Sequence, residues 1–383
     1  MRPDYKFMIK ILLTGGGSGG HVYPLIAVAE ELQKQAVRQS LDLDLLFLGA
    51  DGLMKDVAAS VGIKFQATVS SKWRRYTSAQ NFIDILKVPL GFLQALIHVW
   101  SYMPDLIFSK GGFDSFLPAL AARIFGISVV IHESDAIPGK ANIWVGKWAK
   151  KIFVAFNGAL SYFKQDKVEL VGNPIRAGLL NFIDRSAAVS AFGLDSVRPV
   201  VLITGASQGS QVVNETLLLS LAELTKKFQI IHQCGARNYD QVNARILNIV
   251  KEGEGTYGKI IAGSYRLYPI FDLQQMAAAY SAADVIVSRA GAGSIFEIAA
   301  VGKPAVVIPL KGSASDHQSA NAREFAKYGA IVIEEDNLTP HILINEIENN
   351  YRDHSIISPK IKDFSKPDAA KVIARQLLAG LAQ

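Results

Sequence analysis

The sequence predicts an α/β protein made of two doubly wound, Rossmann-like domains that face a cleft. Short Val/Ile/Leu runs alternate with longer amphipathic segments, and the two halves of the chain carry similar strand-to-helix turns. Continuous apolar runs of this kind are typical of parallel strands covered by helices on both faces. At 383 residues, the chain is also too long for one ordinary domain.

Apolar runs predict six strands in each half of the chain. In the first half they are Ile9–Thr14, Leu45–Leu48, Leu106–Ser109, Val129–His132, Ile152–Phe156 and Val168–Val171. In the second half they are Val200–Thr204, Ile230–Gln233, Ile260–Gly263, Val285–Ser288, Ala305–Pro309 and Ala330–Ile333. The first strand of each half ends in a Thr-Gly step, TGGGSGG or TGASQGS, which indicates two similar domains rather than a short-period repeat.

The turn at Asn173-Pro174 marks the predicted domain boundary. It assigns residues 1–175 to an N-terminal domain and residues 176–365 to a C-terminal domain. The last segment, about 366–383, has the composition of a helix, and we expect it to pack back on the N-terminal domain.

Composition narrows the functional classes. Half of the residues are hydrophobic and 19% are charged, which excludes a disordered chain. The single cysteine, Cys234, excludes an internal disulfide framework and fits a reducing compartment. No signal peptide is evident, and the uncharged stretch Val88–Pro104 is shorter than the roughly 20 apolar residues of a membrane span. A net charge of +6 is compatible with binding to nucleic acid, anionic lipid or phosphorylated substrates.

The glycine-rich turn Gly15–Gly20 is the strongest local signal for a ligand site. Glycines allow a close approach of the backbone, and the helix that follows offers free N–H groups to a phosphate. The turn also matches the dinucleotide fingerprint, but the nearest acidic residue at a strand end, Asp51, lies about 31 positions past Gly20 instead of about 20. This spacing disfavours an NAD-dependent dehydrogenase. His21 begins the helix and could accept a proton from a hydroxyl nucleophile, the alternative being a structural hydrogen bond.

Two more small-residue turns, 205–210 and 288–294, each join a predicted strand to a helix, the second of which carries Glu297. Three anion-binding turns favour a diphosphate-containing ligand held between two domains. A further helix begins after Asp316, a candidate N-cap. Its polar residues His317, Gln318 and Asn321 share one face and suit hydrogen bonds to sugar hydroxyls, unless they form a solvated helix start.

Nothing in the sequence has the Cys/His spacing of a metal site, so we expect no tightly bound metal. Asp42-Leu43-Asp44 is similar to the Asp-x-Asp element that binds a metal ion in many sugar transferases. It lies at the entry of a strand, away from the carboxyl end where α/β sites form, and is interpreted as surface.

A basic and aromatic segment is a candidate membrane-binding patch. A basic rim beside apolar side chains is what an anionic membrane surface attracts, although a core-facing helix with a solvated basic loop is the alternative. The basic residues are confined to one short segment and no nucleic-acid-binding motif accompanies them, which disfavours binding to nucleic acid. The patch consists of Lys72, Trp73, Arg74, Arg75, Phe82, Lys87 and Phe92.

Taken together, an ordered set of segments resembles the MurG family of transferases, which attach N-acetylglucosamine to lipid I in peptidoglycan synthesis. The segments are GGGSGGHVYP, KGGF, HESDAIPGKAN, GNPIR, ASQGS, FDLQQMAAAYSAADVIVSRAGAGSIFEIAAVGKP and DHQSANA. The resemblance covers almost the whole chain and implies the glycosyltransferase-B fold. It also implies an N-terminal domain for the lipid-linked acceptor, a C-terminal domain for the UDP-sugar, and a peripheral place on the cytoplasmic face of the cell membrane, with cell-wall synthesis proteins as partners.

By the same resemblance, the reaction is an inverting transfer from UDP-N-acetylglucosamine, with His21 as the general base. The implied donor contacts are Arg176 and Ser207 at the diphosphate, the backbone near Leu273 at the uracil, Glu297 at the ribose, and Ala292, His317 and Gln318 at the sugar. Ser18, Gly19, Gln208, Arg289 and Asn321 complete the donor site, while Gly17, Gly20, Glu133 and Asp135 form the acceptor and diphosphate loop. No tightly bound cofactor is implied, and a divalent cation would be stimulatory rather than structural.

Two departures from the family pattern stand out. Ser18 replaces the usual Thr and keeps a hydroxyl. Ser134-Asp135 replaces the usual Gln-Asn, and an ionised Asp135 only accepts hydrogen bonds. A negative charge near a diphosphate is unfavourable unless a cation compensates it. Asp135 could therefore take part in proton abstraction, mark a modified acceptor, or face away.

Three other functions stay open from the sequence. A glycolipid synthase of the same fold would use a diacylglycerol acceptor, although the HES…PGKAN and DHQSANA segments favour the peptidoglycan enzyme. A UDP-N-acetylglucosamine 2-epimerase would act on the free nucleotide sugar. A non-catalytic scaffold would bind the UDP-sugar and turn nothing over.

Overall fold

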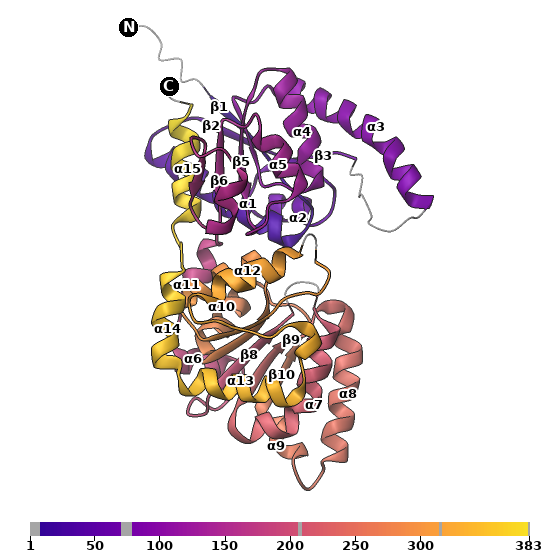
Figure 1. The fold of residues 1–383 in the computed structure, drawn as a ribbon, viewed down its shortest axis with the longest axis vertical. Helices are drawn as coiled ribbons and strands as arrows, with labels where there is room; N and C mark the ends of the chain where they lie inside the picture. Colours follow the sequence, from indigo (N-terminus) through magenta and orange to yellow (C-terminus); the bar gives the residue numbers. More distant parts are fainter. Residues whose placement is uncertain (1–7, 70–78, 206–208, 314–315, 382–383) are drawn as a thin grey trace. The chain divides into compact units, whose positions relative to one another are not determined.

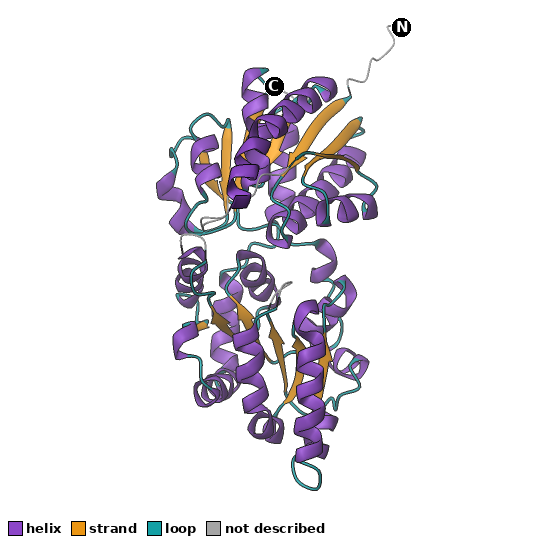
Figure 2. Ribbon diagram, turned by 90° about the vertical axis from the view of Figure 1, so that its right-hand side faces the viewer, coloured by secondary structure: helices purple, strands orange, loops and turns teal. Residues whose placement is uncertain are grey.

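The computed structural model describes residues 8–69, 79–205, 209–313 and 316–381, the side chains of residues 79–87 excepted. The chain forms two compact units (Figures 1 and 2). Unit 1 comprises Met1–Arg176 and Lys366–Gln383, and unit 2 comprises Ala177–Ser365. The division after Arg176 falls one residue beyond the boundary predicted from the sequence.

Unit 1 contains a seven-stranded parallel sheet in the order β3-β2-β1-β4-β5-β6-β7. The strands are β1 (Ile9–Thr14), β2 (Leu43–Gly49), β3 (Lys64–Ala67), β4 (Leu106–Ser109), β5 (Ser128–Glu133), β6 (Lys151–Val154) and β7 (Val168–Leu170). The strand order reverses between β1 and β4, which is the switch point where ligands of α/β sheets bind. Thr14 and Ser109 end these two strands and are paired there.

Side chains of each strand alternate between two cores. Ile11 and Leu13 of β1 are fully buried in one core, and Leu12 is fully buried in the other. The first core is covered by α1 (Gly19–Arg38) and α2 (Leu53–Ser60). The second is covered by α3 (Ala79–Tyr102), α4 (Phe113–Ile124) and α5 (Lys140–Gly146). Burial on both faces explains why these strands read as continuous apolar runs.

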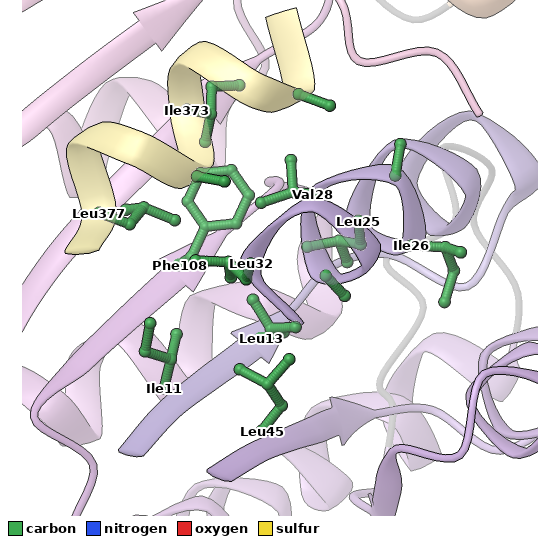
Figure 3. Packing of buried hydrophobic residues seen from close by; sticks show 14 of the residues in the cluster. Ile11, Leu13, Leu25, Ile26, Val28, Leu32, Leu45, Phe108, Ile373 and Leu377 are labelled. Atoms are coloured by element: carbon green, nitrogen blue, oxygen red, sulfur yellow. The ribbon is translucent and has the colours of Figure 1, made fainter. Parts of the chain in front are cut away.

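The last helix, α15 (Ala369–Ala379), packs along α1 in unit 1 (Figure 3). Ile373 and Leu377 are buried in the same core as β1. The Gln35 side-chain amide on α1 donates to the Lys371 carbonyl at 3.0 Å. The end of the chain therefore completes the core of the N-terminal unit.

Unit 2 contains a six-stranded parallel sheet in the order β10-β9-β8-β11-β12-β13. Its strands are β8 (Val200–Thr204), β9 (Gln229–Gln233), β10 (Tyr265–Tyr268), β11 (Val285–Arg289), β12 (Ala305–Ile308) and β13 (Ile331–Val332). Its helices are α6 (Arg185–Ala191), α7 (Gln211–Lys227), α8 (Tyr239–Glu252), α9 (Gly258–Ser264), α10 (Leu273–Ala282), α11 (Ala292–Val301), α12 (His317–Ala326), α13 (Pro340–Arg352) and α14 (His354–Asp363). Short 3-10 helices lie at Ala177–Leu180, Ala236–Asn238 and Glu335–Asn337 in this unit, and at Asn157–Tyr162 in unit 1. The switch point of this sheet lies between β8 and β11.

Most predicted strands are confirmed to within two residues, but the predicted strand Ile260–Gly263 is wrong. This segment belongs to the helix α9, where Ile261 is fully buried and Ile260 is 45% exposed. The strand β10 follows it, and a short apolar run alone does not distinguish the two structures. The edge strand β3 was not predicted because none of its four residues is buried. No helix in the described part of the chain is long and apolar enough to span a membrane.

Candidate active site

The loops that follow β1 and β4 meet at the switch point of unit 1. The Gly16 amide donates to the Gly111 carbonyl at 2.9 Å, and the Lys110 amide donates to the Thr14 carbonyl at 2.8 Å. Gly112 has a φ of +86°, and a Cβ there would lie 2.9 Å from the Gly16 Cα. Glycine is therefore required at this close approach of two loops.

His21 lies in the first turn of α1, against these loops. Its Nδ1 is 3.2 Å from the Lys110 carbonyl oxygen, which only accepts, so Nδ1 carries the proton and Nε2 the lone pair. A Cβ on Gly16 or Gly112 would lie 3.5 Å from Nε2, so the glycines leave space around this nitrogen. Burial lowers the pKa of His21, the Lys110 charge lowers it further, and Asp135 opposes both. The imidazole is therefore neutral near pH 7, with Nε2 able to accept a proton.

Glu133 ends β5 and organises the loop that carries Asp135. Its carboxylate accepts from the backbone amides of Asp135 (2.9 Å) and Gly139 (3.0 Å) and from the Asn142 side chain (2.9 Å). Burial and the charge of Asp135 raise the pKa of Glu133 to about 7, against these hydrogen bonds. Glu133 is buried and holds the loop, whereas Asp135 is half-buried.

Lys110 follows β4 and is a central residue of this site that the sequence analysis did not single out. It is 1% exposed. Its ammonium contacts His132 and Ser134 of the neighbouring strand and loop, and Asn173 at the end of unit 1. The only sequence signal was its place in the KGGF segment, directly after a predicted strand.

Arg176 ends the first segment of unit 1, and Tyr23 on α1 positions its guanidinium. The Cζ of Arg176 lies 4.1 Å from the centre of the Tyr23 ring. The buried Nε has no hydrogen-bond partner among the described residues. Stacking uses the flat face of the guanidinium and leaves its terminal N–H groups for an anion.

The remaining predicted residues of the glycine-rich turn surround the N-terminus of α1. Gly17, Ser18 and Gly20 are exposed, and Gly19 is half-buried. Ser18 occupies the N-cap position but forms no side-chain cap. The first-turn amides and the Ser18 hydroxyl are thus placed for a ligand at this edge.

Arg289 ends β11 at the switch point of unit 2. Its guanidinium donates to Glu335 at 2.8 Å and to the carbonyls of Ile308 and Pro309 at 3.3 Å each. The side chain is 8% exposed. Arg289 therefore holds the loop after β12 in place.

Other predicted donor residues begin or lie on helices of unit 2. Ala292 is the first residue of α11, and Glu297 on the same helix accepts a hydrogen bond from the Tyr280 hydroxyl at 2.9 Å. Leu273 is the first residue of α10, whose N-cap Asp272 forms a capping box. The free backbone amides of these first turns are placed for polar ligands.

His317 and Gln318 begin α12, after Asp316 at φ +52° and ψ +30°. The predicted side-chain cap by Asp316 is absent, because this left-handed conformation differs from the extended one of a capping residue. Such a conformation is strained for a residue other than glycine. The Gln318 side-chain oxygen accepts from the Leu310 amide at 3.0 Å, which joins the helix to the loop after β12.

Of the remaining predicted donor residues, one is buried and two lie outside the described part of the chain. Asn321 is fully buried, and its amide lies 3.4 Å from the Ala290 carbonyl, so it supports the turn before α11. Ser207 and Gln208 lie outside the described residues. No group of three or more His, Cys, Asp or Glu side chains that could hold a metal ion occurs within the described ranges.

The candidate membrane patch is only partly described. Lys72, Trp73, Arg74 and Arg75 lie outside the described residues, and so do the side chains of Phe82 and Lys87 on α3. Phe92 is half-buried and packs against the core of unit 1, so it contributes less to an exposed surface than we expected. Among the described side chains of α3, the exposed apolar ones are Leu90 (50%), Leu93 (54%), Ile97 (53%) and Trp100 (65%), which we call the α3 stripe.

Two parallel sheets, each with a switch point in its strand order, define a two-domain α/β protein of the glycosyltransferase-B class. The N-terminal domain model of glycosyltransferase family 28 matches residues 11–154, and the C-terminal domain model of that family matches residues 200–375. The UDP-N-acetylglucosamine–N-acetylmuramyl-(pentapeptide) pyrophosphoryl-undecaprenol N-acetylglucosamine transferase of Legionella pneumophila (strain Paris) is 33% identical over 369 residues, 95% of each chain. The crystal structure of Acinetobacter baumannii MurG superposes with a TM-score of 0.73 at 26% identity, covering 97% of this chain and 99% of that one.

The chain therefore belongs to the MurG family within glycosyltransferase family 28. A UDP-GlcNAc 2-epimerase from Neisseria meningitidis, bound to UDP-GlcNAc, is similar in structure with a TM-score of 0.65. It covers 97% of this chain at 16% identity, so this likeness shows a shared fold alone.

Proposed function

We propose that this chain transfers N-acetylglucosamine from UDP-N-acetylglucosamine to the 4-hydroxyl of the N-acetylmuramoyl unit of lipid I, which gives lipid II. The observation that carries the proposal is the full-length likeness to transferases named for this reaction. The geometry adds a neutral histidine with a free Nε2 at the ligand-binding edge of unit 1. It also adds a group of polar side chains at the corresponding edge of unit 2.

In this reaction, Nε2 of His21 accepts the proton of the 4-hydroxyl while the oxygen attacks the anomeric carbon. The bond between that carbon and the diphosphate oxygen breaks, and UDP leaves with the electron pair. The configuration at the carbon is inverted. Arg176 stabilises the charge on the departing diphosphate. It supplies this stabilisation without a tightly bound metal, and a divalent cation would act on the substrates.

In the donor site of unit 2, we assign the ribose hydroxyls to Glu297 and the uracil to the backbone at Leu273. Tyr280 supports the ribose assignment because its hydroxyl donates to the Glu297 carboxylate and fixes the position of that side chain. Ala292, His317 and Gln318 lie at the first turns of α11 and α12 and would meet the sugar.

The α3 stripe supports binding of unit 1 to the membrane that holds the acceptor, on its cytoplasmic face. Its members recur at spacings of three, four and three along one helix, so they share a face. Contiguous exposed apolar side chains on a helix are typical of an interfacial segment. The basic residues Lys72, Arg74 and Arg75 precede this helix in the sequence and would favour anionic lipid.

UDP release from UDP-N-acetylglucosamine tests the reaction, measured with and without a short-chain lipid I analogue. We expect release only when both substrates are present. His21→Gln should lower the rate by about 100-fold or more because the general base is lost, whereas His341→Gln on the exposed face of α13 should not change it. Release without an acceptor, or with diacylglycerol instead, would favour a different enzyme, and donor binding without turnover would favour a scaffold.

Sedimentation with anionic and neutral vesicles tests the membrane surface. The double variant Leu93→Glu/Ile97→Glu should lose binding to anionic vesicles because it places two charges in the α3 stripe. Val37→Glu is the matched control, since Val37 is 79% exposed on α1. Equal binding by both variants would contradict the assignment of this surface.

A further inference from the structure

The segment 171–176, which ends in Arg176, follows β7 and forms neither helix nor strand. Its first five residues are buried all the same. In the described part of the chain, its last backbone hydrogen bond to the sheet comes from the Gly172 amide, which donates to the Val154 carbonyl at 3.3 Å. Beyond that point, other groups must hold the segment, because buried polar groups of the backbone need partners and a fixed place.

Two buried side chains from neighbouring strands hold this segment. His132 on β5 is 0% exposed, and its Nε2 donates to the Gly172 carbonyl at 2.8 Å. Lys110, directly after β4, is 1% exposed, and its Nζ lies 3.0 Å from Asn173 Oδ1. Two consecutive residues of the segment are thus tied to two different strands of the sheet.

The two side chains are also tied to each other. The Gly172 carbonyl only accepts, so Nε2 of His132 carries the ring proton and Nδ1 keeps a lone pair. This lone pair faces the Lys110 Nζ at 2.7 Å, and the ammonium also donates to the Ser134 hydroxyl. The three N–H groups of Lys110 therefore have three buried acceptors, and the loss of this donor would leave them unsatisfied. We call Lys110, His132, Ser134 and Asn173 the Lys110 cluster.

The path from the Lys110 cluster to Arg176 is short and stiff. Only Pro174 and Ile175 separate Asn173 from Arg176. Pro174 has a fixed φ and restricts Asn173 to an extended backbone, while Ile175 is 5% exposed. At the other end, the Tyr23 ring receives the guanidinium, whose Cζ lies 4.1 Å from its centre. The Lys110 cluster therefore sets where the Arg176 side chain starts, and Tyr23 sets where it ends.

We infer that Lys110 is a positioning residue for Arg176: through Asn173 and His132 it holds the segment 171–176 so that the guanidinium is in place before a diphosphate binds. Lys110 is buried and acts through Arg176. The inference rests on the proposed function for the ligand of Arg176, the diphosphate of UDP. The fixing of the segment itself does not depend on that function and can be measured without a ligand.

Hydrogen exchange followed by mass spectrometry measures how firmly the segment is held, in peptides that cover residues 168–180. Lys110→Met keeps most of the apolar side chain and removes its three donors. It should speed exchange in these peptides by about tenfold, because the hydrogen bonds that resist local opening are lost. Asn173→Ala removes a single acceptor of the cluster and should act in the same direction. Lys64→Met is the matched control, since it removes an ammonium of unit 1 that pairs with Asp44 at the surface, and exchange should not change there.

Calorimetry with UDP tests whether Lys110 acts through Arg176. Lys110→Met should weaken UDP binding by about tenfold, since the guanidinium is no longer preorganised. Arg176→Met should weaken it at least as much. In the double variant, Lys110→Met should have little further effect, because the group that it positions is already absent. A merely structural role would weaken binding by the same factor with or without Arg176.

Unchanged exchange in both Lys110→Met and Asn173→Ala would overturn the inference, and so would effects on UDP affinity that multiply in the double variant. If Lys110→Met does not fold, Asn173→Ala takes its place in both measurements and the same outcomes decide. If Arg176→Met binds UDP as tightly as the wild type, the proposed role of Arg176 at the diphosphate fails. The exchange experiment then still decides whether Lys110 holds the segment.

Discussion

The ion pair between Arg289 and Glu335 allows a quantitative test of how unit 2 builds its donor site. The two side chains are 8% and 13% exposed, and Glu335 also accepts from the Lys311 amide at 2.8 Å. Removing one partner of a buried pair costs about 3–5 kcal/mol, because the other charge is left unpaired. Arg289→Met also removes the donor from the carbonyls of Ile308 and Pro309. We therefore expect this variant to lower the free energy of unfolding by about 3 kcal/mol.

Glu335→Gln keeps the shape of the side chain and one acceptor oxygen, so its cost should be smaller, about 2 kcal/mol. The double variant should cost less than the sum of the single ones by about 1–2 kcal/mol, since the residues are in direct contact. Urea unfolding measures these free energies, and calorimetry with UDP measures the affinity of the donor site. We expect weaker UDP binding in Arg289→Met, because Arg289 holds the loop that precedes α12.

Lys311→Met is the control for these single and double variants, since Lys311 forms an exposed ion pair with Asp336. It should leave both stability and UDP affinity unchanged. The reasoning is refuted if Arg289→Met behaves like Lys311→Met, or if the two single variants add without any coupling.

The pH dependence of stability is an independent test of the ion pair between Arg289 and Glu335. Burial raises the pKa of Glu335, but the hydrogen bonds from Arg289 and from the Lys311 amide outweigh burial and leave the pKa below its ordinary value of 4.5. The carboxylate therefore stabilises the fold fully above that value, and the contribution is lost as the pH falls through the lower, folded-state pKa. The stability difference between wild type and Glu335→Gln should be constant at neutral pH and should narrow below about pH 4.

Three further changes test unit 1. Tyr23→Leu should lower the transfer rate because Arg176 loses its stacking partner, whereas Tyr23→Phe should retain most of the activity. An equal loss of activity in both variants would show that the hydroxyl of Tyr23, and not its ring, is needed. Gly112→Ala should destabilise unit 1 by roughly 1–3 kcal/mol, because alanine is strained at a φ of +86°. It should also lower kcat more than UDP affinity, and a neutral effect on Tm would contradict the close contact with Gly16. Ile373→Ala should cost about 2–5 kcal/mol, seen as a lower Tm with UDP affinity unchanged.

Sequence patterns predicted the fold where burial alone decides the structure. The strands β1 and β8 match their predictions to the residue, because fully covered parallel strands must be continuously apolar. The sequence patterns failed where contacts between distant residues decide the secondary structure. In α9, one isoleucine is buried and its neighbour is exposed, which a run of four residues cannot reveal.

The same limit applies to the candidate active site. The glycine turn and His21 have local signatures, so both were predicted from the sequence. The environment of Lys110 combines Ser134 and Asn173, which lie 24 and 63 residues further along the chain.

The place of α15 in unit 1 has a consequence for the synthesis of the chain. At roughly 5–20 residues per second, a ribosome needs on the order of 10–40 s to make Ala177–Ser365, and only then do the residues that complete the core of unit 1 emerge. The first unit to be translated is therefore the last to be finished. A chain that stops early would leave the core around Ile373 and Leu377 open to proteases and chaperones, so that proteolysis would remove incomplete enzymes before they compete for substrate.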